Sequence, residues 1–224
     1  ALGCVAADLL ARAGVGTMRL VDDDVVTLEN LHRQVLYDEA DAAAGRAKVL
    51  AAKRRLRRIN GDVRVEPVGA RLGAGNAAEL AAGCDVIVDG TDNFETRFIV
   101  NDLSVRDGVP WVFAGVVGAE AQTMTIRPPD TPCLRCIFES PPPRCQDPDC
   151  RTAGVLGGAV AAVAGIEAVE AVKLIAGAAD VGGVLTRLDL WTGRIRQTDV
   201  SASVDRDACF CCGRRDFEFL DEGN

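Results

Sequence analysis

The sequence is poor in groups that commonly accompany acid–base catalysis or membrane insertion. It has one histidine, His32, and no apolar run reaches the ~18 uninterrupted residues that a membrane-spanning helix needs. Because a lone histidine is more often structural than catalytic, we assign His32 no catalytic role. Positive charge is also scarce, since 25 Lys and Arg stand against 33 Asp and Glu for a net charge of −8. An acidic chain is a poor general binder of nucleic acid or anionic membrane, so we expect neither as a partner.

The sequence also shows no secretory signal, which bears on its nine cysteines. We therefore expect a cytoplasmic protein whose thiols serve as metal ligands or nucleophiles rather than in disulfides. Four of them form two Cys-x-x-Cys pairs, which predict a tetrahedral, structural Zn²⁺ site between distant parts of the chain. Unrelated free thiols are the alternative. Cys211 lies inside the second pair, but the glycine after Cys212 favours the two-residue spacing. The predicted zinc ligands are Cys133, Cys136, Cys209 and Cys212.

A strand is lacking before the first expected helix. The sequence begins directly with a helical pattern that Gly14 closes, and Asp22 follows Gly3 by 19 residues. A dinucleotide-type unit runs strand, glycine-rich turn, helix, strand and acid, with about 20 residues between the glycines and the acid. We therefore expect Gly3 to be the last glycine of a G-x-G-x-x-G turn and the N-terminus to be truncated before it.

The stretch 20–34, LVDDDVVTLENLHRQ, predicts a nucleotide site. A short apolar strand ends in acid, and Asp22 is placed to accept hydrogen bonds from both ribose hydroxyls. Asn30 and Arg33 follow in a loop, and a guanidinium can donate two hydrogen bonds to phosphate oxygens. The alternative is an acidic turn followed by a solvated helix start.

A second group of carboxylates follows the expected strand 84–89, in the sequence DGTDN at 89–93. Asp92 stands directly before an expected helix. It is either the N-cap of that helix or a Mg²⁺ ligand beside the phosphates, because Mg²⁺ prefers a carboxylate together with phosphate oxygens. Lys48 lies in an expected helix over 42–59, where it is either solvated or directed toward the strand ends.

Strands and helices alternate over the first half of the chain, which predicts an α/β, Rossmann-like, doubly wound and mostly parallel sheet. A Pro- and Cys-rich crossover loop over about 128–152 lacks periodicity. A long apolar helix and an antiparallel hairpin follow it, and the hairpin and cysteine tail span about 184–224. We expect one domain over 1–224. Further helices are expected at 76–82, 94–106 and 153–176, and strands at 18–21, 63–68, 109–115, 121–127, 184–190 and 194–200.

With these motifs in this order, the chain resembles the MoeB/ThiF/HesA family, the bacterial relatives of ubiquitin-activating enzymes. The resemblance covers nearly the whole chain and includes its opening ALGC, residues 20–34, GRAK at 45–48, DGTDN, both cysteine pairs and DCRTAGVLGG at 149–158. It implies an adenylyltransferase that activates the C-terminal carboxylate of a ubiquitin-like sulfur-carrier protein. ATP, Mg²⁺ and Zn²⁺ would be its cofactors, and molybdopterin, thiamine or related biosynthesis its pathway.

The resemblance also implies a role for each matching residue. Asp22 would hold the ribose, and Arg33, Lys48 and Mg²⁺-bound Asp92 would act at the triphosphate as catalytic groups. Cys150 matches a crossover-loop cysteine that is covalently linked to the carrier in some relatives; Cys145 competes for that role. The implied nucleotide-binding set is Gly3, Asp22, Asn30, Arg33, Gln34, Lys48, Asp92 and Asn93.

The family resemblance further implies a homodimer, a carrier ending in Gly-Gly and a separate sulfurtransferase as sulfur donor. Three alternatives stay open. An NAD-dependent oxidoreductase would share the helix–strand–acid opening but not Arg33, Lys48 or the cysteine pairs. A non-catalytic, zinc-stapled scaffold would bind the carrier without activating it. A related adenylyltransferase would act on a peptide, another small carboxylate or a modified tRNA base, although the acidic charge disfavours RNA.

Overall fold

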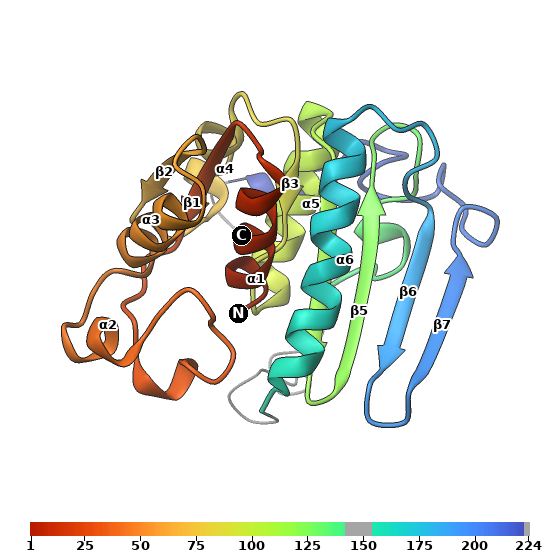
Figure 1. Ribbon diagram of the computed structural model, residues 1–224. Helices are drawn as coiled ribbons and strands as arrows, with labels where there is room; N and C mark the ends of the chain where they lie inside the picture. The colour runs from red at the N-terminus through yellow and green to blue at the C-terminus, as the bar shows by residue number, and fades with distance from the viewer. Residues whose placement is uncertain (142–153, 222–224) are drawn as a thin grey trace.

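The strands of the chain form two hydrogen-bonded groups (Figure 1) in a computed structural model that describes residues 1–141 and 154–221. β1 and β2 pair in parallel, and the other five strands form a sheet of order β3-β4-β5-β6-β7. The strands are β1 Thr17–Val21, β2 Arg64–Val68, β3 Ile87–Val88, β4 Trp111–Val117, β5 Glu120–Ile126, β6 Val184–Asp189 and β7 Arg194–Asp199.

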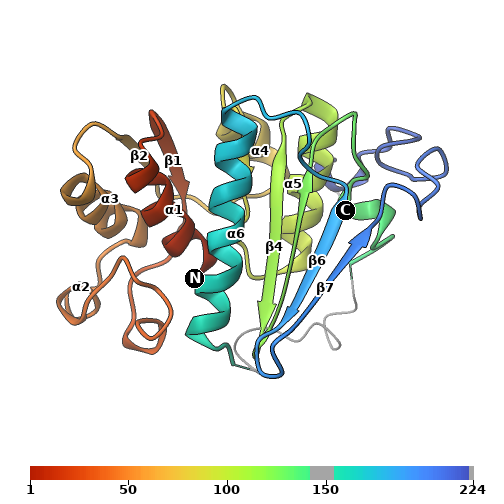
Figure 2. The ribbon, with the colours of Figure 1, turned by 45° about the vertical axis from the view of Figure 1, so that its right-hand side comes forward.

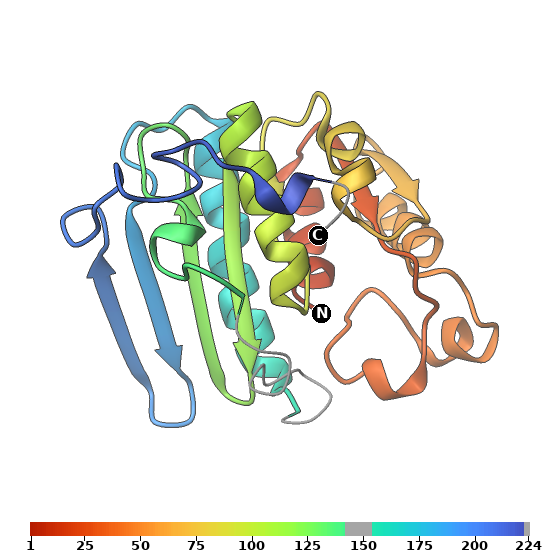
Figure 3. The ribbon, with the colours of Figure 1, turned by 180° about the vertical axis from the view of Figure 1, so that it is seen from behind.

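Helices cover both faces of these strands. α1 and α6 pack against each other on the face turned to the viewer in Figure 1, and α5 lies on the opposite face, seen in Figure 3. None of the helices in the described ranges is long and apolar enough to cross a membrane. The helices are α1 Leu2–Ala13, α2 Glu39–Ala43, α3 Lys48–Ile59, α4 Ala74–Ala81, α5 Phe94–Asp107 and α6 Gly157–Ile175.

The sheet is mixed, so the expectation of a mostly parallel sheet is wrong. Of the pairings among the described strands, β1–β2 and β3–β4 are parallel, whereas β4–β5, β5–β6 and β6–β7 are antiparallel. The reversal begins where only Gly118 and Ala119 separate β4 from β5. A connection this short permits antiparallel pairing alone, because a parallel neighbour needs a crossover of a dozen or more residues. The expected C-terminal hairpin is confirmed.

The centre of the larger sheet is deeply buried. Trp111 and Phe113 of β4 are fully buried, as is Phe98 of α5 on the neighbouring helix. On the other face, α6 presents small residues such as Ala159 and Ala164, which let it pack closely against α1 and β4. Figure 2 shows the β6–β7 hairpin extending beyond α6, and all six residues of β7 are exposed.

The single helix expected over 42–59 is wrong, because the chain breaks between α2 and α3. Gly45 has φ +56°, a left-handed conformation that favours glycine. The residues after it turn back to the loop that follows β1: Val26 N–H donates to the Arg46 carbonyl at 2.8 Å, and Ala47 forms an isolated bridge with Val25. As a result α3 begins at Lys48, beside the acidic end of β1.

Candidate functional site

A cavity of about 2360 Å³ lies between β1 and β3 and extends beyond their carboxyl ends. In parallel α/β structures this edge of the sheet is where ligands bind. Every residue of the predicted nucleotide site lines this one cavity, although they come from four separate segments of the chain. The residues are Gly3, Asp22, Asn30, Arg33, Gln34, Lys48, Asp92 and Asn93.

Lys48 stands in the first turn of α3 and points into the acidic end of β1. Its Nζ donates to Asp24 Oδ2 at 2.6 Å and lies 3.9 Å from Asp22 Oδ2. Its backbone N–H also donates to the Asp24 carbonyl at 2.9 Å. The lysine side chain is 8% exposed, so it is directed toward the strand end and is not solvated. This places a buried cation beside the carboxylate predicted to bind the ribose.

The loop after Asp24 carries a second cation. Arg33 Nη2 donates to Asn30 Oδ1 at 2.7 Å, and Asn30 Nδ2 donates to Thr27 Oγ1 at 2.9 Å, so the amide links the guanidinium to the start of the loop. Gln34 is buried, and its Oε1 accepts no hydrogen bond from the described residues. A buried acceptor without a donor is costly, and a ligand hydroxyl or amine in the cavity would satisfy it.

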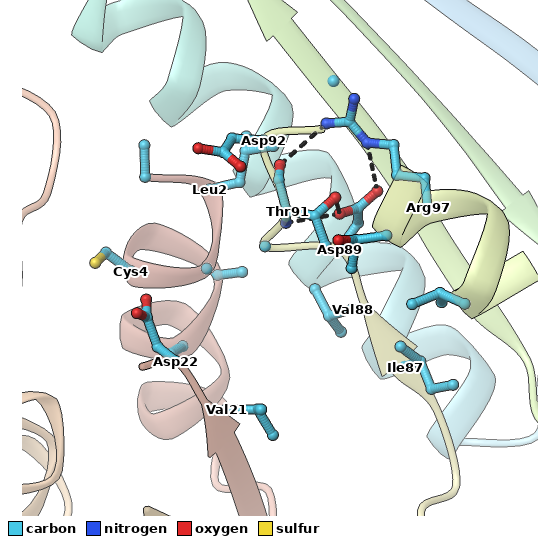
Figure 4. Close-up of a pocket in the computed structure, with 18 of the residues that line it drawn as sticks. Leu2, Cys4, Val21, Asp22, Ile87, Val88, Asp89, Thr91, Asp92 and Arg97 are labelled. Atoms are coloured by element: carbon cyan, nitrogen blue, oxygen red, sulfur yellow. Dashed lines mark hydrogen bonds and ion pairs between the residues drawn. The ribbon is translucent and has the colours of Figure 1, made fainter. Parts of the chain in front are cut away.

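The turn after β3 is held by Arg97 of α5. The Arg97 side chain is 8% exposed; its Nε donates to Asp89 Oδ2 at 3.2 Å, and its Nη2 donates to the Thr91 carbonyl at 3.0 Å. Asp89 also accepts from the Thr91 backbone N–H at 2.8 Å and from its hydroxyl at 2.7 Å. Figure 4 shows this network, with the Asp92 carboxylate pointing away from Arg97.

Asp92 is not the N-cap of α5. Asn93 is the N-cap, and its side chain accepts a hydrogen bond from the Thr96 N–H at 2.8 Å. The Asp92 carboxylate accepts one hydrogen bond from the Asn93 amide at 3.2 Å and lines the cavity. The alternative that Asp92 serves only as a cap is therefore wrong, and a carboxylate remains available at the carboxyl end of β3.

The sequence reasoning did not find the buried charges behind this turn. Arg97 and Glu167 each lie inside a helix and belong to no predicted motif. Asp89 does belong to one, because it is the first residue of DGTDN. Glu167 of α6 is fully buried, and neither carboxylate oxygen has a hydrogen-bond partner among the described residues. Burial raises the pKa of Glu167 well above 4.5, the nearby Asp89 raises it further, and Arg97 opposes them. Burial behind the turn therefore disfavours the ionised form of Glu167.

The four predicted zinc ligands meet in a separate cluster. The Sγ distances are 3.8 Å for Cys133–Cys136, 3.7 Å for Cys133–Cys209 and 3.3 Å for Cys136–Cys212, and all four sulfurs lie within 4.8 Å of one another. Four thiolates about 2.3 Å from a central Zn²⁺ lie about 3.8 Å apart, so the cluster fits a tetrahedral zinc site. Hydrogen bonding among the four thiols lowers the pKa of Cys209, whereas the pKa values of Cys133, Cys136 and Cys212 are raised.

Not every cysteine considered in the sequence belongs to the four-cysteine cluster of the described residues. Cys211 is buried next to the cluster but is not part of it, as the spacing argument expects. Cys150 and its competitor Cys145 lie outside the described residues, so the expected nucleophile stays a prediction.

The fold and cavity define a class: an α/β protein with a cavity at the carboxyl ends of two parallel strands and a four-cysteine cluster that fits zinc. The chain belongs to the ThiF family, whose model matches residues 1–211. It is 42% identical over 224 residues to the sulfur carrier protein ThiS adenylyltransferase of Bacillus subtilis, covering all of this chain and 66% of that protein. It is 38% identical over 218 residues to the sulfur carrier protein adenylyltransferase of Thermus thermophilus, covering 95% of this chain and 79% of that protein.

Another relative, the SAMP-activating enzyme E1 of Haloferax volcanii, is 45% identical over 156 residues, which are 70% of this chain and 57% of that protein. The chain thus spans less than two thirds of the length of several curated relatives that it matches. Among solved structures, E. coli MccB with MccA-N7isoASN superposes with a TM-score of 0.81 at 21% identity, covering 95% of this chain and 64% of that one. This similarity shows the fold.

Proposed function

We propose that the protein containing this chain adenylates the C-terminal carboxylate of a ubiquitin-like sulfur-carrier protein. The observation that carries this proposal is the convergence of Asp22, Arg33, Lys48 and Asp92 on one cavity at the carboxyl ends of two parallel strands. Two relatives that are 38% and 42% identical are named as adenylyltransferases of sulfur carriers. Family membership also disfavours the NAD-dependent oxidoreductase that shared the opening pattern.

The proposed reaction requires alignment and charge neutralisation more than proton transfer. The carrier carboxylate forms a bond to the α-phosphorus of ATP while the bond from that phosphorus to the bridging oxygen breaks, giving an acyl-adenylate and pyrophosphate. The attacking carboxylate is already anionic and needs no general base. Cations placed where charge develops on the phosphoryl oxygens accelerate such a transfer. This agrees with the position of Arg33 and Lys48 in the lining of the cavity.

Arg33 and Lys48 supply those cations, and both already have protein partners. Asn30 accepts from Arg33, and Asp24 accepts from Lys48. A triphosphate would compete with these acceptors for the same N–H groups, and Asp24 would hold Lys48 at the strand end until it does. Asp22 binds the ribose hydroxyls in this scheme, and Gly3 allows close approach of the phosphates.

Asp92 is the residue that would hold Mg²⁺ beside the phosphates, with the Asn93 amide next to it. Its carboxylate lines the cavity and accepts a hydrogen bond from that amide. The ion would neutralise phosphate charge. The chain's contribution is the position of the carboxylate, because Asp89 and Arg97 fix the turn that carries it.

We further propose that a parallel strand lies between β1 and β3 in the complete protein. Among the described strands, β1 pairs only with β2 and β3 only with β4, and the cavity separates their remaining edges. A strand supplied by residues before Ala1 would join the two groups into one sheet and bring a phosphate-binding turn to Gly3. A structure of the complete protein with no strand between β1 and β3 would contradict this.

The active form would be a homodimer. Val169, Val172 and Ile175 are exposed along one face of α6, with exposed fractions of 58%, 38% and 49%. An exposed row of aliphatic side chains on one helix is typical of a protein–protein contact. A separate sulfurtransferase would deliver sulfur to the activated carrier, and Cys150 is retained as the proposed covalent residue for that stage.

The test is ATP–[³²P]pyrophosphate exchange with the full-length protein and a panel of Gly-Gly-ended ubiquitin-like carriers. Exchange that depends on one carrier would support the proposal and identify the substrate. Exchange with small peptides or carboxylates alone would favour the alternative adenylyltransferase. Carrier binding without exchange, in zinc-loaded protein, would favour the non-catalytic scaffold.

A further inference from the structure

The four-cysteine cluster is clamped by a side chain that is not one of its ligands. Asn101 of α5 is fully buried. Its Oδ1 accepts a hydrogen bond from the backbone N–H of Leu134, inside the first Cys-x-x-Cys segment, at 2.7 Å. Its Nδ2 donates to the sulfur of Cys211, inside the second segment, at 3.3 Å. One amide group therefore contacts both cysteine-bearing segments.

These two segments lie far apart in the sequence. Cys133 and Cys209 are separated by 76 residues, yet their sulfurs lie 3.7 Å apart. Neither segment belongs to a strand or to a helix longer than one turn, so regular secondary structure does not fix their distance. α5 fixes the distance between the two segments, because Asn101 of this helix contacts both of them. The helix is well packed, and its residue Phe98 is fully buried.

The adjacent residue strengthens the same clamp. Asp102 is fully buried, accepts from the Phe219 N–H at 3.2 Å, and lies 3.5 Å from Arg135 Nη1. Arg135 belongs to the first cysteine segment and Phe219 to the tail beyond the second. Asp102 also accepts from the Asn101 amide at 3.3 Å, which satisfies the remaining donor of that group.

We infer that Asn101 is the positioning residue of the metal centre: it holds the two cysteine segments in the arrangement that binds zinc, without touching the metal. Cys211 acts as a hydrogen-bond acceptor for this clamp and not as a ligand. The inference rests on the positions of the four cysteine sulfurs, which lie within 4.8 Å of one another. The inference is independent of the proposed adenylation, since zinc binding is read without nucleotide. Hydrogen bonds to groups around metal ligands commonly change metal affinity by about 10- to 100-fold.

The test is zinc affinity of the full-length protein, measured by competition with a chromophoric chelator. Asn101→Ala is expected to weaken zinc binding by about 10- to 100-fold. The matched control is Ser104→Ala on the same helix, which removes one part-buried hydrogen bond at 2.6 Å whose acceptor, the Val109 carbonyl, belongs to neither cysteine segment. The control is expected to retain wild-type zinc affinity.

Thermal unfolding with and without bound zinc separates positioning from general destabilisation. The loss of melting temperature in Asn101→Ala is expected to shrink when both proteins are zinc-free, because the clamp then has no metal site to organise. Equal zinc affinity in Asn101→Ala and Ser104→Ala would overturn the inference. So would an equal thermal loss with and without zinc, or wild-type protein that binds no zinc.

A second variant keeps the test decisive should Asn101→Ala fail to fold. Cys211→Ala removes only the acceptor on the second segment. It is expected to release zinc several-fold faster while its Co²⁺-substituted form keeps the spectrum of four thiolate ligands. A spectrum with one fewer thiolate would make Cys211 a ligand, and unchanged zinc release would remove the second half of the clamp. Either result overturns the assignment.

Discussion

At the scale of single residues, the position of one helix cap decides which carboxylate is available for chemistry. Asn93 caps α5, so Asp92 is not used for that purpose and faces the cavity. The two residues are adjacent and both are good N-caps, which is why the sequence left the question open. Capping depends on which side chain can reach the N–H of Thr96, and this is a matter of backbone direction rather than residue type.

Asp92→Asn is expected to lower the rate of carrier-dependent ATP–pyrophosphate exchange by at least about 100-fold, because the neutral amide is a poor Mg²⁺ ligand. Stability should change little, since the substitution is isosteric and the carboxylate is not the cap. The control is Asp107→Asn at the far end of α5, where the carboxylate pairs with Arg106. Retained exchange in Asp92→Asn would remove Asp92 from the metal role.

Glu167 should make the stability of the protein depend on pH in an unusual direction. Its pKa in the folded state is raised above 4.5, mainly by burial. The folded state therefore keeps a proton that the unfolded state loses, and the contribution of Glu167 to stability is complete below the ordinary pKa and declines as pH rises toward the raised value. Asp89 raises and Arg97 lowers the pKa of this carboxyl group, so both affect the pH range over which stability declines.

Glu167→Gln removes that decline because glutamine stays neutral at every pH. The free energy of unfolding of Glu167→Gln relative to wild type should increase with pH, by up to about 1.4 kcal/mol per pH unit within the window. Urea unfolding of both proteins at several pH values between 5 and 9 (roughly the range in which such buried acids titrate) measures this. A pH-independent difference would show that Glu167 is ionised in the folded protein.

At the scale of elements, α5 connects the two functional regions and is anchored separately to each. Arg97 in its second turn binds the turn after β3, and Asn101, one turn later, binds both cysteine segments. Arg97 also lies over the rings of Phe94 and Phe113, at 5.4 Å and 5.5 Å from their centroids. The first two turns of α5 therefore have an anchor that does not involve the cysteine cluster.

Removing zinc with a chelator is expected to lower the melting temperature and to deprotect the amides of 133–137 and 209–214 in hydrogen exchange. Protection over 94–100 should persist, because Arg97 holds that part of α5 independently. Hydrogen exchange resolves such local opening. Simultaneous loss of protection at 94–100 would show that the metal centre, rather than Arg97, stabilises the turn that carries Asp92.

At the scale of the whole molecule, the exposed face of α6 is the expected contact with a second copy. Val169→Asp is expected to weaken dimerisation by at least about 10-fold, because a charge at the centre of an apolar contact is left unpaired. Sedimentation equilibrium over a range of concentrations measures the shift. The matched control is Ile195→Asp on β7, since Ile195 is similarly exposed, at 63%, but lies on the distant hairpin. Equal dimerisation of the two variants would place the contact elsewhere.

Local patterns predicted much of the secondary structure because helical and strand periodicity depend on neighbouring residues. α1, β1, β2, α4, α5 and the β6–β7 hairpin follow the expected ranges closely. The predictions failed where a distant segment decided the outcome. The helix over 42–59 breaks because residues 45–47 pair with the loop after β1, and the sheet is mixed because β5 returns beside β4. Neither pairing changes the local pattern of apolar and polar residues, so the sequence pattern did not predict it.

Motif order and spacing alone predict which residues would carry the proposed chemistry: the acids after two strands, the Asn-x-x-Arg loop, Lys48 and the two cysteine pairs. The spacing within a motif is a local property and does not depend on how the rest of the chain folds. Which of these groups meet, and which side chains hold them, depends on the folded chain. The ion pair of Arg97 with Asp89, the buried Glu167 and the contact of Asn101 with Cys211 join residues that are 8 to 110 positions apart or lie on different elements. Such contacts depend on how the elements pack, and packing is a property of the whole chain.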